Sequence, residues 1–391
     1  MKKSQFIAPS MGLVIPISGF DSRFNEPYEH WAFLPHPLPD HVDLSNQTWA
    51  EITAASHSLG RLEQAAQQLD DTSILQRPIL RKEAQSTSAL EGTFAPIHDI
   101  LHNDPSSNHS QSPEIFEVLN YVTAAEYACA SVRDRPLSLQ LILETHRLLI
   151  SGTRSDGAET GKIRKRQVVI GPQSMRVADA RFVPPPPGNQ LDDGMRELIK
   201  WINTDLPLVP PLVAVALAHY QFETLHPFND GNGRIGRLLM VLHLLRRKVL
   251  RDPIISISPW FERFRDDYQD SLLKVSQTGD IDQWVNFFAR GIRFQADDTL
   301  RIINELLVLR DRFTAVCRVH NVRGVALEVA QSLITRPVIT PTLVQELHSI
   351  SYPAANAATS RLEQVGIIKE STGGSYGRIF TAQEVIDILE K

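Results

Sequence analysis

Two strongly apolar segments, 212–224 and 233–250, flank a short polar loop, and this arrangement constrains the fold more than any other sequence feature. Both segments carry apolar residues at helical spacing. Similar patterns come before and after them, so the sequence predicts a mainly α-helical chain. The loop between the two segments is rich in charged and glycine residues, and it is the candidate functional site.

Helices are expected wherever apolar residues recur three and four positions apart. One region, 166–183, breaks this pattern and reads as a short β-hairpin followed by a run of prolines. A single hairpin among helices suggests either a functional flap or a surface excursion. The first forty residues, rich in proline and aromatics, read as an extended arm. The predicted helices are 49–69, 79–92, 114–130, 137–150, 191–203, 212–224, 233–250, 259–276 and 281–309.

The chain is longer than one hydrophobic core usually serves, so two or three packed units are expected from its 391 residues. The last part looks like a separate unit. Short helices are predicted to begin near Thr340 and near Ser351, and the second is predicted to end at Gly366. Two strands follow within 367–380. Two helices and then a strand pair form the outline of a winged helix-turn-helix unit.

The composition excludes several classes of protein. A net charge of -5, 42% hydrophobic and 22% charged residues are typical of an ordinary folded protein and unlike a disordered or membrane chain. DNA binding would need a local basic patch, because its free energy comes from Lys and Arg. Cys129 and Cys317 have no Cys or His at metal-ligand spacing, which argues against a zinc site. The sequence shows no signal peptide and no bilayer-spanning run, so the expected location is the cytoplasm.

The polar loop has the composition of a phosphate-binding site. Gly231 and Gly233 permit backbone conformations in which successive N–H groups point at one anion. The helix that begins there adds the positive end of its dipole. Arg234 and Arg237 are three residues apart, so both can contact phosphates from one side of this helix. The loop is not a P-loop, because no Gly-Lys-Ser/Thr closes it.

Two further side chains of the loop add chemistry. Asp230 supplies the hard oxygen that Mg²⁺ takes when it also shares substrate phosphates. His226, held at a helix end by Pro227, is the nearby side chain that can accept a proton near neutral pH. The loop therefore predicts a general base beside a metal-bound phosphate group.

The segment HPFNDGNGRIGR, 226–237, resembles the signature of Fic-domain proteins, His-x-Phe-x-Asp/Glu-Gly-Asn-Gly-Arg-x-x-Arg, at every fixed position. The resemblance implies a Fic-type helical bundle with a small β-hairpin flap. It also implies transfer of AMP from ATP, with Mg²⁺, to Ser, Thr or Tyr hydroxyls of target proteins, the chain itself included. Fic proteins of this build often form homodimers. Further resemblance lies in 161–171, 201–203, 218–220 and 265–268.

The family comparison implies a role for each part of the site. His226 would take the proton of the target hydroxyl, Asp230 would hold Mg²⁺, and Phe228 would point inward and fix the loop. The hairpin would lie over the nucleotide as a flap that pairs with the target backbone, and Tyr268 would lie near the adenine. The residues expected at the nucleotide are Glu91, Ile170, Gly171, Pro172, Gln173, Asp230, Gly231, Asn232, Gly233, Arg234, Ile235, Gly236, Arg237 and Tyr268.

An upstream motif resembles the inhibitory sequence of the family, Ser/Thr-x-x-x-Glu-Gly/Asn. Here Thr87 stands four residues before Glu91, and Gly92 follows. The resemblance implies a two-pronged contact between Glu91 and Arg237 that keeps the γ-phosphate out of the position required for transfer. The resting chain is therefore expected to be inhibited. Related proteins also use this Glu to remove AMP, so the dominant direction of the reaction stays open.

Two other functions remain as alternatives. The chain could be a regulator that binds DNA through its winged helix, although the expected recognition helix, 353–364, carries one cation, Arg361. A Fic enzyme could also transfer a different phosphate-containing group. The expected domains are an N-terminal arm and helical region with the inhibitory helix, a catalytic core, a connecting helix and a winged-helix domain, at 1–110, 111–295, 296–325 and 326–391.

Overall fold

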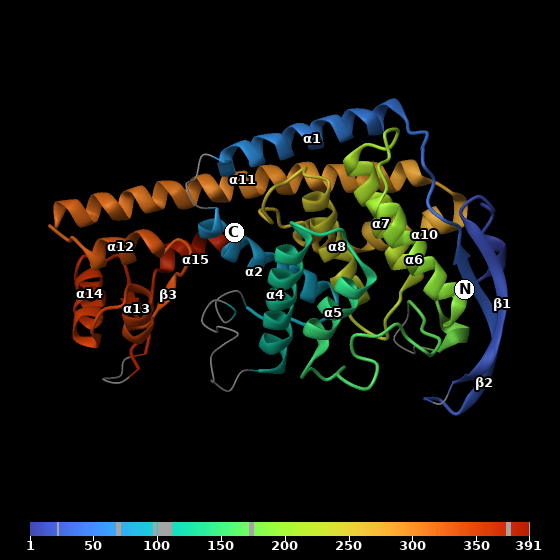
Figure 1. Cartoon of the computed structure of the whole chain (residues 1–391), viewed down its shortest axis with the longest axis horizontal. Helices are drawn as coiled ribbons and strands as arrows, with labels where there is room; N and C mark the ends of the chain where they lie inside the picture. The colour runs from blue at the N-terminus through green and yellow to red at the C-terminus, as the bar shows by residue number, and fades with distance from the viewer. Residues whose placement is uncertain are drawn as a thin grey trace.

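A computed structural model of the chain describes residues 1–21, 23–67, 72–96, 100, 112–171, 176–372 and 377–390. The fold is mainly helical, as predicted, with two small antiparallel sheets (Figure 1). The predicted ends of most helices agree with the observed ones to within a few residues. The helices of the central body are α1 (Asn46–Gln67), α2 (Ser73–Leu90), α4 (Pro113–Val132), α5 (Leu139–Ile150), α6 (Asn189–Asn203), α7 (Pro211–Leu225), α8 (Asn232–Arg246), α9 (Ser258–Arg263), α10 (Arg265–Thr278) and α11 (Ile281–Val319).

Polar side chains mark where several of these helices begin. Ser112 and Ser138 accept hydrogen bonds from the backbone N–H groups of the first turns of α4 and α5, at 3.3 and 3.1 Å. Asp280 does the same for α11 at 3.0 Å. Such caps satisfy backbone donors that a helix start leaves unpaired. Because these capping signals are local, the sequence alone predicts where the helices begin.

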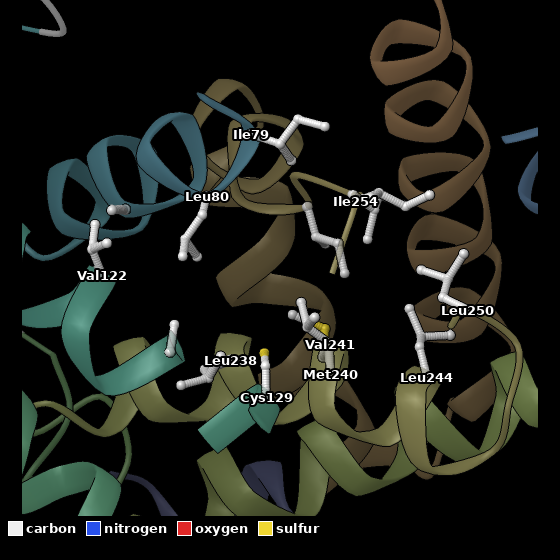
Figure 2. Packing of buried hydrophobic residues seen from close by; sticks show 14 of the residues in the cluster. Ile79, Leu80, Val122, Cys129, Leu238, Met240, Val241, Leu244, Leu250 and Ile254 are labelled. Carbon is white, nitrogen blue, oxygen red and sulfur yellow. The ribbon is translucent and has the colours of Figure 1, made fainter. Parts of the chain in front are cut away.

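Helices α7 and α8 lie at the centre of the molecule. Every residue of α7 except Pro211 and Glu223 is buried, and in α8 Arg246 alone is not fully buried. Helices α2 and α4 pack against α8 through side chains such as Leu80, Val122 and Leu238 (Figure 2). This packing brings α2, which was predicted to be the inhibitory helix, next to the start of α8.

Helix α11 runs along one side of the molecule beside α1 and reaches the C-terminal elements (Figure 1). It ends at Val319, ten residues beyond the predicted end, and crosses the proposed domain boundary at 295 without a break. An ion pair of 3.2 Å between Arg293 and Glu51 joins α11 to α1. Within the described residues, no helix is both long and apolar enough to cross a membrane.

The prediction of an extended N-terminal arm is wrong in one respect: the arm is a long β-hairpin. Strands β1 (Gly12–Asp21) and β2 (Glu26–Pro35) pair over their whole length. Pro16 and two glycines interrupt the apolar alternation of β1, which hid the strand. Phe33 of β2 donates its backbone N–H to the carbonyl of Val183 at 2.9 Å, so the hairpin supports the predicted flap region.

The predicted hairpin at 166–183 is also only partly correct. Ile170 and Phe182 form a single antiparallel bridge, with hydrogen bonds of 2.9 Å in both directions. A short 3-10 turn at Val177–Asp179 occupies the second arm, and its valine is buried against the hairpin of β1 and β2. This side-chain burial and the following prolines, which lack N–H donors, prevent longer pairing. Pro172 and Gln173 lie outside the described residues.

The C-terminal elements form a small unit of helices and short strands. The predicted helices correspond to α13 (Pro341–His348) and α14 (Tyr352–Gln364), and the predicted strands to β4 (Lys369–Glu370) and β5 (Phe380–Thr381). The sheet order is β3-β5-β4. The sequence reading missed three elements: α12 (Val325–Ser332), β3 (Val338–Ile339) and α15 (Gln383–Glu390). The name winged helix remains a proposal for this unit.

Candidate active site

His226 lies at the end of α7 in a strained backbone conformation. Its φ of 49° and ψ of 61° are in the left-handed region, which most residues avoid. The Nδ1 atom lies 3.3 Å from the carbonyl oxygen of Glu223, one turn earlier. A proton on Nδ1 suits this contact, which leaves Nε2 as the nitrogen that can accept a proton.

The charge state of His226 is set by its surroundings. Burial, and next the positive charge of Arg164, lower the pKa of the imidazole to about 4. Because the folded-state pKa is below the ordinary value, the ring is neutral at physiological pH and becomes charged only as the pH falls toward 4. A neutral imidazole is the form that a general base requires.

Arg164 holds the backbone around His226. Its guanidinium is buried and donates to four carbonyl oxygens: His226 at 2.8 Å, Arg166 at 3.0 Å, Pro185 at 2.6 Å and Leu225 at 3.5 Å. The backbone N–H of Arg164 donates to the carbonyl of Pro227 at 2.9 Å. One planar side chain thus ties the motif loop to the proline run that follows the flap.

Replacing Arg164 by methionine is expected to lower the free energy of unfolding by about 2–4 kcal/mol, because several buried carbonyls lose their donors. The measurement is urea unfolding followed by circular dichroism. Arg196→Met on α6 is the control; its side chain is 63% exposed and pairs with Asp193 of the same helix. That control is expected to change the free energy by less than about 0.5 kcal/mol. Equal effects of the two substitutions would contradict the role given to Arg164.

The motif loop is braced from inside. Phe228 is buried, as expected, and its ring stacks on His146 with centroids 3.8 Å apart. The Asn232 side chain accepts from the Phe228 N–H at 2.8 Å and donates to its carbonyl at 2.9 Å. Both polar atoms of this amide are therefore used by the loop, and Asn232 supports the phosphate site without facing it. Ile235 is part of the core.

Two glycines shape the start of α8. Gly231 has a φ of +78°, the left-handed conformation expected from the sequence. At Gly233 an added Cβ would lie 2.1 Å from the Glu91 carboxylate oxygen and 3.0 Å from the Arg237 guanidinium. The absence of a side chain at 233 therefore lets a carboxylate approach the first turn of α8.

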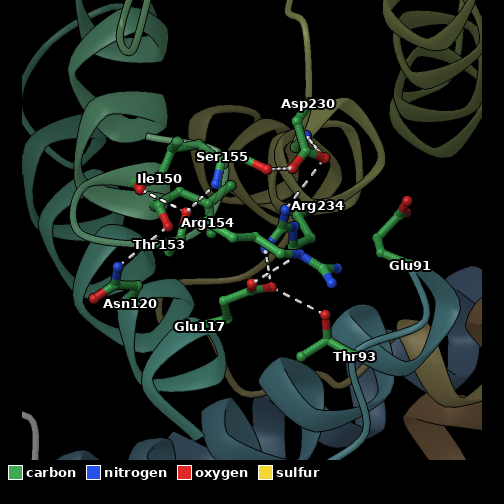
Figure 3. Close-up of polar contacts among 12 residues, drawn as sticks. Glu91, Thr93, Glu117, Asn120, Ile150, Thr153, Arg154, Ser155, Asp230 and Arg234 are labelled. Atoms are coloured by element: carbon green, nitrogen blue, oxygen red, sulfur yellow. Dashed lines mark hydrogen bonds and ion pairs between the residues drawn. The ribbon is translucent and has the colours of Figure 1, made fainter. Parts of the chain in front are cut away.

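Asp230 lies on the other side of the loop (Figure 3). Its carboxylate accepts hydrogen bonds from Ser155 and, at 2.6 Å, from the N–H of Gly231. Burial raises the pKa of Asp230, but the charge of Arg234 and these hydrogen bonds outweigh it, so the pKa is lowered and the group is ionised. Asp230 lines a cavity of about 310 Å³ that does not include His226.

Arg234 is held by two acids. Its Nη1 lies 3.5 Å from Glu117 on α4, and its Nη2 lies 3.5 Å from Asp230 (Figure 3). Glu117 also accepts from Thr93 at 3.0 Å and pairs with Arg154 at 3.4 Å. Two buried Arg234 nitrogens, Nε and Nη1, have no hydrogen-bond partner in the described part of the chain. A buried guanidinium with unused donors is suited to an anion.

Arg237 is bound by the predicted inhibitory segment. Its Nη2 contacts the Glu91 carboxylate at 2.5 Å, and its Nε donates to the Thr87 hydroxyl at 2.7 Å. The expected two-pronged contact with Glu91 is not formed: Nη2 alone reaches the carboxylate, and Thr87 accepts from Nε through its hydroxyl and from Nη2 through its carbonyl. Burial is the largest single effect and lowers the pKa of Arg237, but Glu91, Tyr268 and Glu223 together outweigh it, so the net pKa is raised.

A cavity of about 490 Å³ joins the end of α2 to α7, α8 and α10. Its lining includes several of the predicted site residues. Tyr268 is among them, with its hydroxyl 2.7 Å from His219. Gly236 keeps its carbonyl 2.9 Å from the same histidine. The predicted residues that line the cavity are Glu91, Ile170, Gly171, His226, Gly233, Arg237 and Tyr268.

The sequence reading missed several residues that the structure brings to the site. Arg164, Glu117, His146 and Glu223 all lie within one or two contacts of the motif loop. Glu223 could have been noticed, because it is three residues before His226 on a helix that is otherwise apolar. Glu117 and His146 carried no local signal, since Arg234 and Phe228, the loop residues that they contact, lie far along the sequence.

The residues present fit a magnesium ion that is shared with a phosphate. Asp230 is ionised and its side chain is 44% exposed. Mg²⁺ is commonly held by one or two carboxylates together with substrate phosphates and water. Among the described residues no group of three His, Cys, Asp or Glu side chains is close enough to hold a metal alone. Asp230 could therefore supply one ligand and would depend on the substrate for others.

Fold and site together define a helical protein in which a neutral histidine lies beside a helix start that carries glycines and arginines. Residues 136–244 match the model of the Fic/DOC family, and residues 49–130 match the model of the Fic/DOC family N-terminal region. The chain belongs to the Fic/DOC family.

Two curated relatives have the same name. The chain is 30% identical over 277 residues to the protein adenylyltransferase Fic of Aedes aegypti, which covers 67% of this chain and 52% of the relative. It is 33% identical over 208 residues to the protein of the same name from Drosophila ananassae, covering 52% of this chain and 38% of the relative. The chain thus spans about half or less of the length of these curated relatives.

Solved structures support the fold. A Fic family protein from Desulfovibrio desulfuricans G20 superposes with a TM-score of 0.56 at 19% identity, over 88% of this chain and 98% of that one. A fragment of Fic-1 from C. elegans, residues 134–508, gives a TM-score of 0.50 at 23% identity, over 65% and 73% of the two chains. At these identities the likeness concerns the fold alone.

Proposed function

We propose that this chain is a protein adenylyltransferase that moves AMP from ATP to a Ser, Thr or Tyr hydroxyl of a target protein. The observation that carries the proposal is the cavity in which a neutral His226 faces the start of α8, with its glycines and Arg237. The same name among the relatives, at 30% and 33% identity, supports it.

The residues would divide the reaction as follows. His226 accepts the proton of the target hydroxyl on Nε2, and the hydroxyl oxygen bonds to the α-phosphorus of ATP as the bond to pyrophosphate breaks. The N–H groups at the start of α8 and the helix dipole stabilise phosphate charge. Arg234 and Arg237 contact further phosphate oxygens. Arg237 can do so only when Glu91 has left it.

Magnesium would be held by Asp230 together with phosphate oxygens. When bound, the ion would neutralise charge on the leaving pyrophosphate. Ser155 and the N–H of Gly231, which both donate to the Asp230 carboxylate, would orient it. Ile170 and Gly171 of the flap line the same cavity as Tyr268, and these residues would contact the nucleoside.

The test is the mass of the modification. The purified chain, with Glu91 replaced by glycine, is incubated with ATP and Mg²⁺ and its peptides are analysed by mass spectrometry. The proposal expects the mass of AMP on a hydroxyl side chain. A gain of a single phosphate would contradict AMP transfer and favour a different phosphate-containing group. The absence of any modification on the chain or on lysate proteins would also count against it.

Removal of AMP is a second candidate for the same site. Glu91 and His226 line one cavity, so the carboxylate could position a water molecule there for attack on the modified target. An AMP-modified target incubated with the intact chain and with Glu91→Gly tests this. Release by the intact chain alone would support it.

DNA binding finds less support. In the C-terminal unit Arg378 is bonded to Glu363 and Glu370, at 3.1 and 2.8 Å. Arg361 donates to the carbonyl of His320 at 3.0 Å. These cations are engaged within the protein, and phosphate contacts would have to displace those partners. We propose that residues 326–391 serve protein contact or pack against the body.

A further inference from the structure

Glu223 is an acid in the active-site cavity that the proposed reaction does not use. Its side chain is 14% exposed, on a helix whose neighbouring residues are buried and mostly apolar. Its Oε2 lies 3.9 Å from Nδ1 of His226. Its Oε1 is buried and has no hydrogen-bond partner in the described part of the chain. A buried carboxyl oxygen without a partner lowers the stability of the fold.

The packing of α8 makes room for this carboxyl. An added Cβ at Gly236 would lie 2.2 Å from the Glu223 Oε1. Glycine inside a helix is about 0.5–1 kcal/mol less favourable than alanine. Gly236 lowers the stability of α8 by this amount. Because it has no side chain, it leaves the space that the Glu223 carboxyl occupies beside His226.

Titratable groups from three other parts of the fold face Glu223. Arg237 of α8 lowers its pKa and Glu91, directly after α2, raises it, while the neutral Tyr268 of α10 is the third neighbour. Burial is the largest cause, and it raises the pKa of Glu223 to about 8. Arg181 and Arg265 line the same cavity. The carboxyl therefore holds its proton at neutral pH and loses it as the pH rises through about 8.

We propose that Glu223 is a positioning residue for His226: its backbone carbonyl keeps the imidazole proton on Nδ1, and its carboxyl, when ionised, stabilises the charge that the ring gains during transfer. The proposal rests on the proposed function of His226 as the base. In the step itself, the hydroxyl proton moves to Nε2 and the Nδ1 proton stays in place. The carboxylate forms no covalent bond, and its negative charge lies on the side of the ring opposite the reacting hydroxyl.

The test compares Glu223→Gln with its parent, both carrying Glu91→Gly so that transfer is measurable. Glutamine keeps the size of the side chain but cannot ionise. In the parent, kcat/KM is expected to rise with pH through a step roughly between pH 6 and 8. This pH step is expected below the pKa that Glu223 has in the intact chain, because the negative charge of Glu91, which raises that pKa, is absent from the parent. Glu223→Gln is expected to remove the step and to lower kcat about fivefold, with KM for ATP within about twofold.

A purely structural role would give a different result. Glu197→Gln on α6, where the side chain is 54% exposed, is the control and should match the parent. Glu223→Asp should restore the pH step, because it can ionise. An unchanged pH profile and kcat in Glu223→Gln would overturn the proposal, as would equal loss of activity in the Gln and Asp variants without any pH step in the parent.

A second measurement does not depend on AMP transfer. In the intact chain with ¹³C-labelled histidine, the His226 ring signals are expected to shift near pH 8, where Glu223 ionises, and Glu223→Gln should abolish that shift. Failure of this shift would overturn the inference alone. If His226→Ala instead transferred AMP at the parental rate, the proposed function would fail, whatever the NMR result.

Discussion

Replacing Glu91 by glycine is expected to raise the rate of AMP transfer at least tenfold, a change of about 1.4 kcal/mol in the barrier. In the intact chain Arg237 is bound by Glu91 at 2.5 Å and by Thr87 at 2.7 Å, and its side chain is 2% exposed. A guanidinium held in this way cannot also contact a phosphate with the same nitrogens. Removing the carboxylate frees one N–H of Nη2, which still donates to the Thr87 carbonyl at 3.1 Å, and glycine adds no side chain to fill the space.

The measurement is incorporation of label from α-labelled ATP into the chain and into lysate proteins. Glu91→Gln keeps the shape of the side chain but loses the charge, so an intermediate rate is expected. Glu126→Gln, on the exposed side of α4, is the control and should behave as the intact chain does. Labelling by Glu91→Gly that equals or falls below that of the intact chain would remove Glu91 as the inhibitory residue.

Replacing His226 by alanine in the Glu91→Gly background is expected to lower kcat by about 10²- to 10⁴-fold, the usual contribution of a general base. The imidazole is neutral above pH 4 because of burial and the nearby charge of Arg164. It is therefore ready to take a proton at physiological pH. The activity of the parent should also fall as the pH drops toward 4, where the ring becomes charged.

The backbone at His226 calls for a second variant. Its φ of 49° disfavours alanine, so part of any loss could come from a displaced loop. Asparagine tolerates the left-handed conformation but cannot act as a base near neutral pH. His226→Asn is expected to fold with an unchanged melting temperature and to be as inactive as His226→Ala. Transfer by His226→Asn at more than about a tenth of the parental rate would exclude histidine as the base.

Most helices could be predicted from the sequence because their signals are local. Apolar periodicity and capping residues such as Ser112, Ser138 and Asp280 act within one or two turns. The β1–β2 hairpin was missed because its pairing is decided by contacts across the turn and with Val183, and its apolar pattern is broken by proline and glycine. The flap was predicted too regular, since the burial of Val177 replaces strand pairing by a turn.

For the candidate site, too, local features could be predicted from the sequence and contacts between distant segments could not. The order of residues in 226–237 was enough to predict a base, a turn of glycines and two arginines, because all of them act within one loop and one helix. Only the tertiary structure decided which partner each residue meets. Glu91 reaches Arg237 from 146 positions away, Glu117 reaches Arg234, and Asp230 faces a different cavity from His226. Such contacts depend on how α2, α4 and α8 pack; apolar periodicity shows that each helix has a buried face, but not which distant segment covers it.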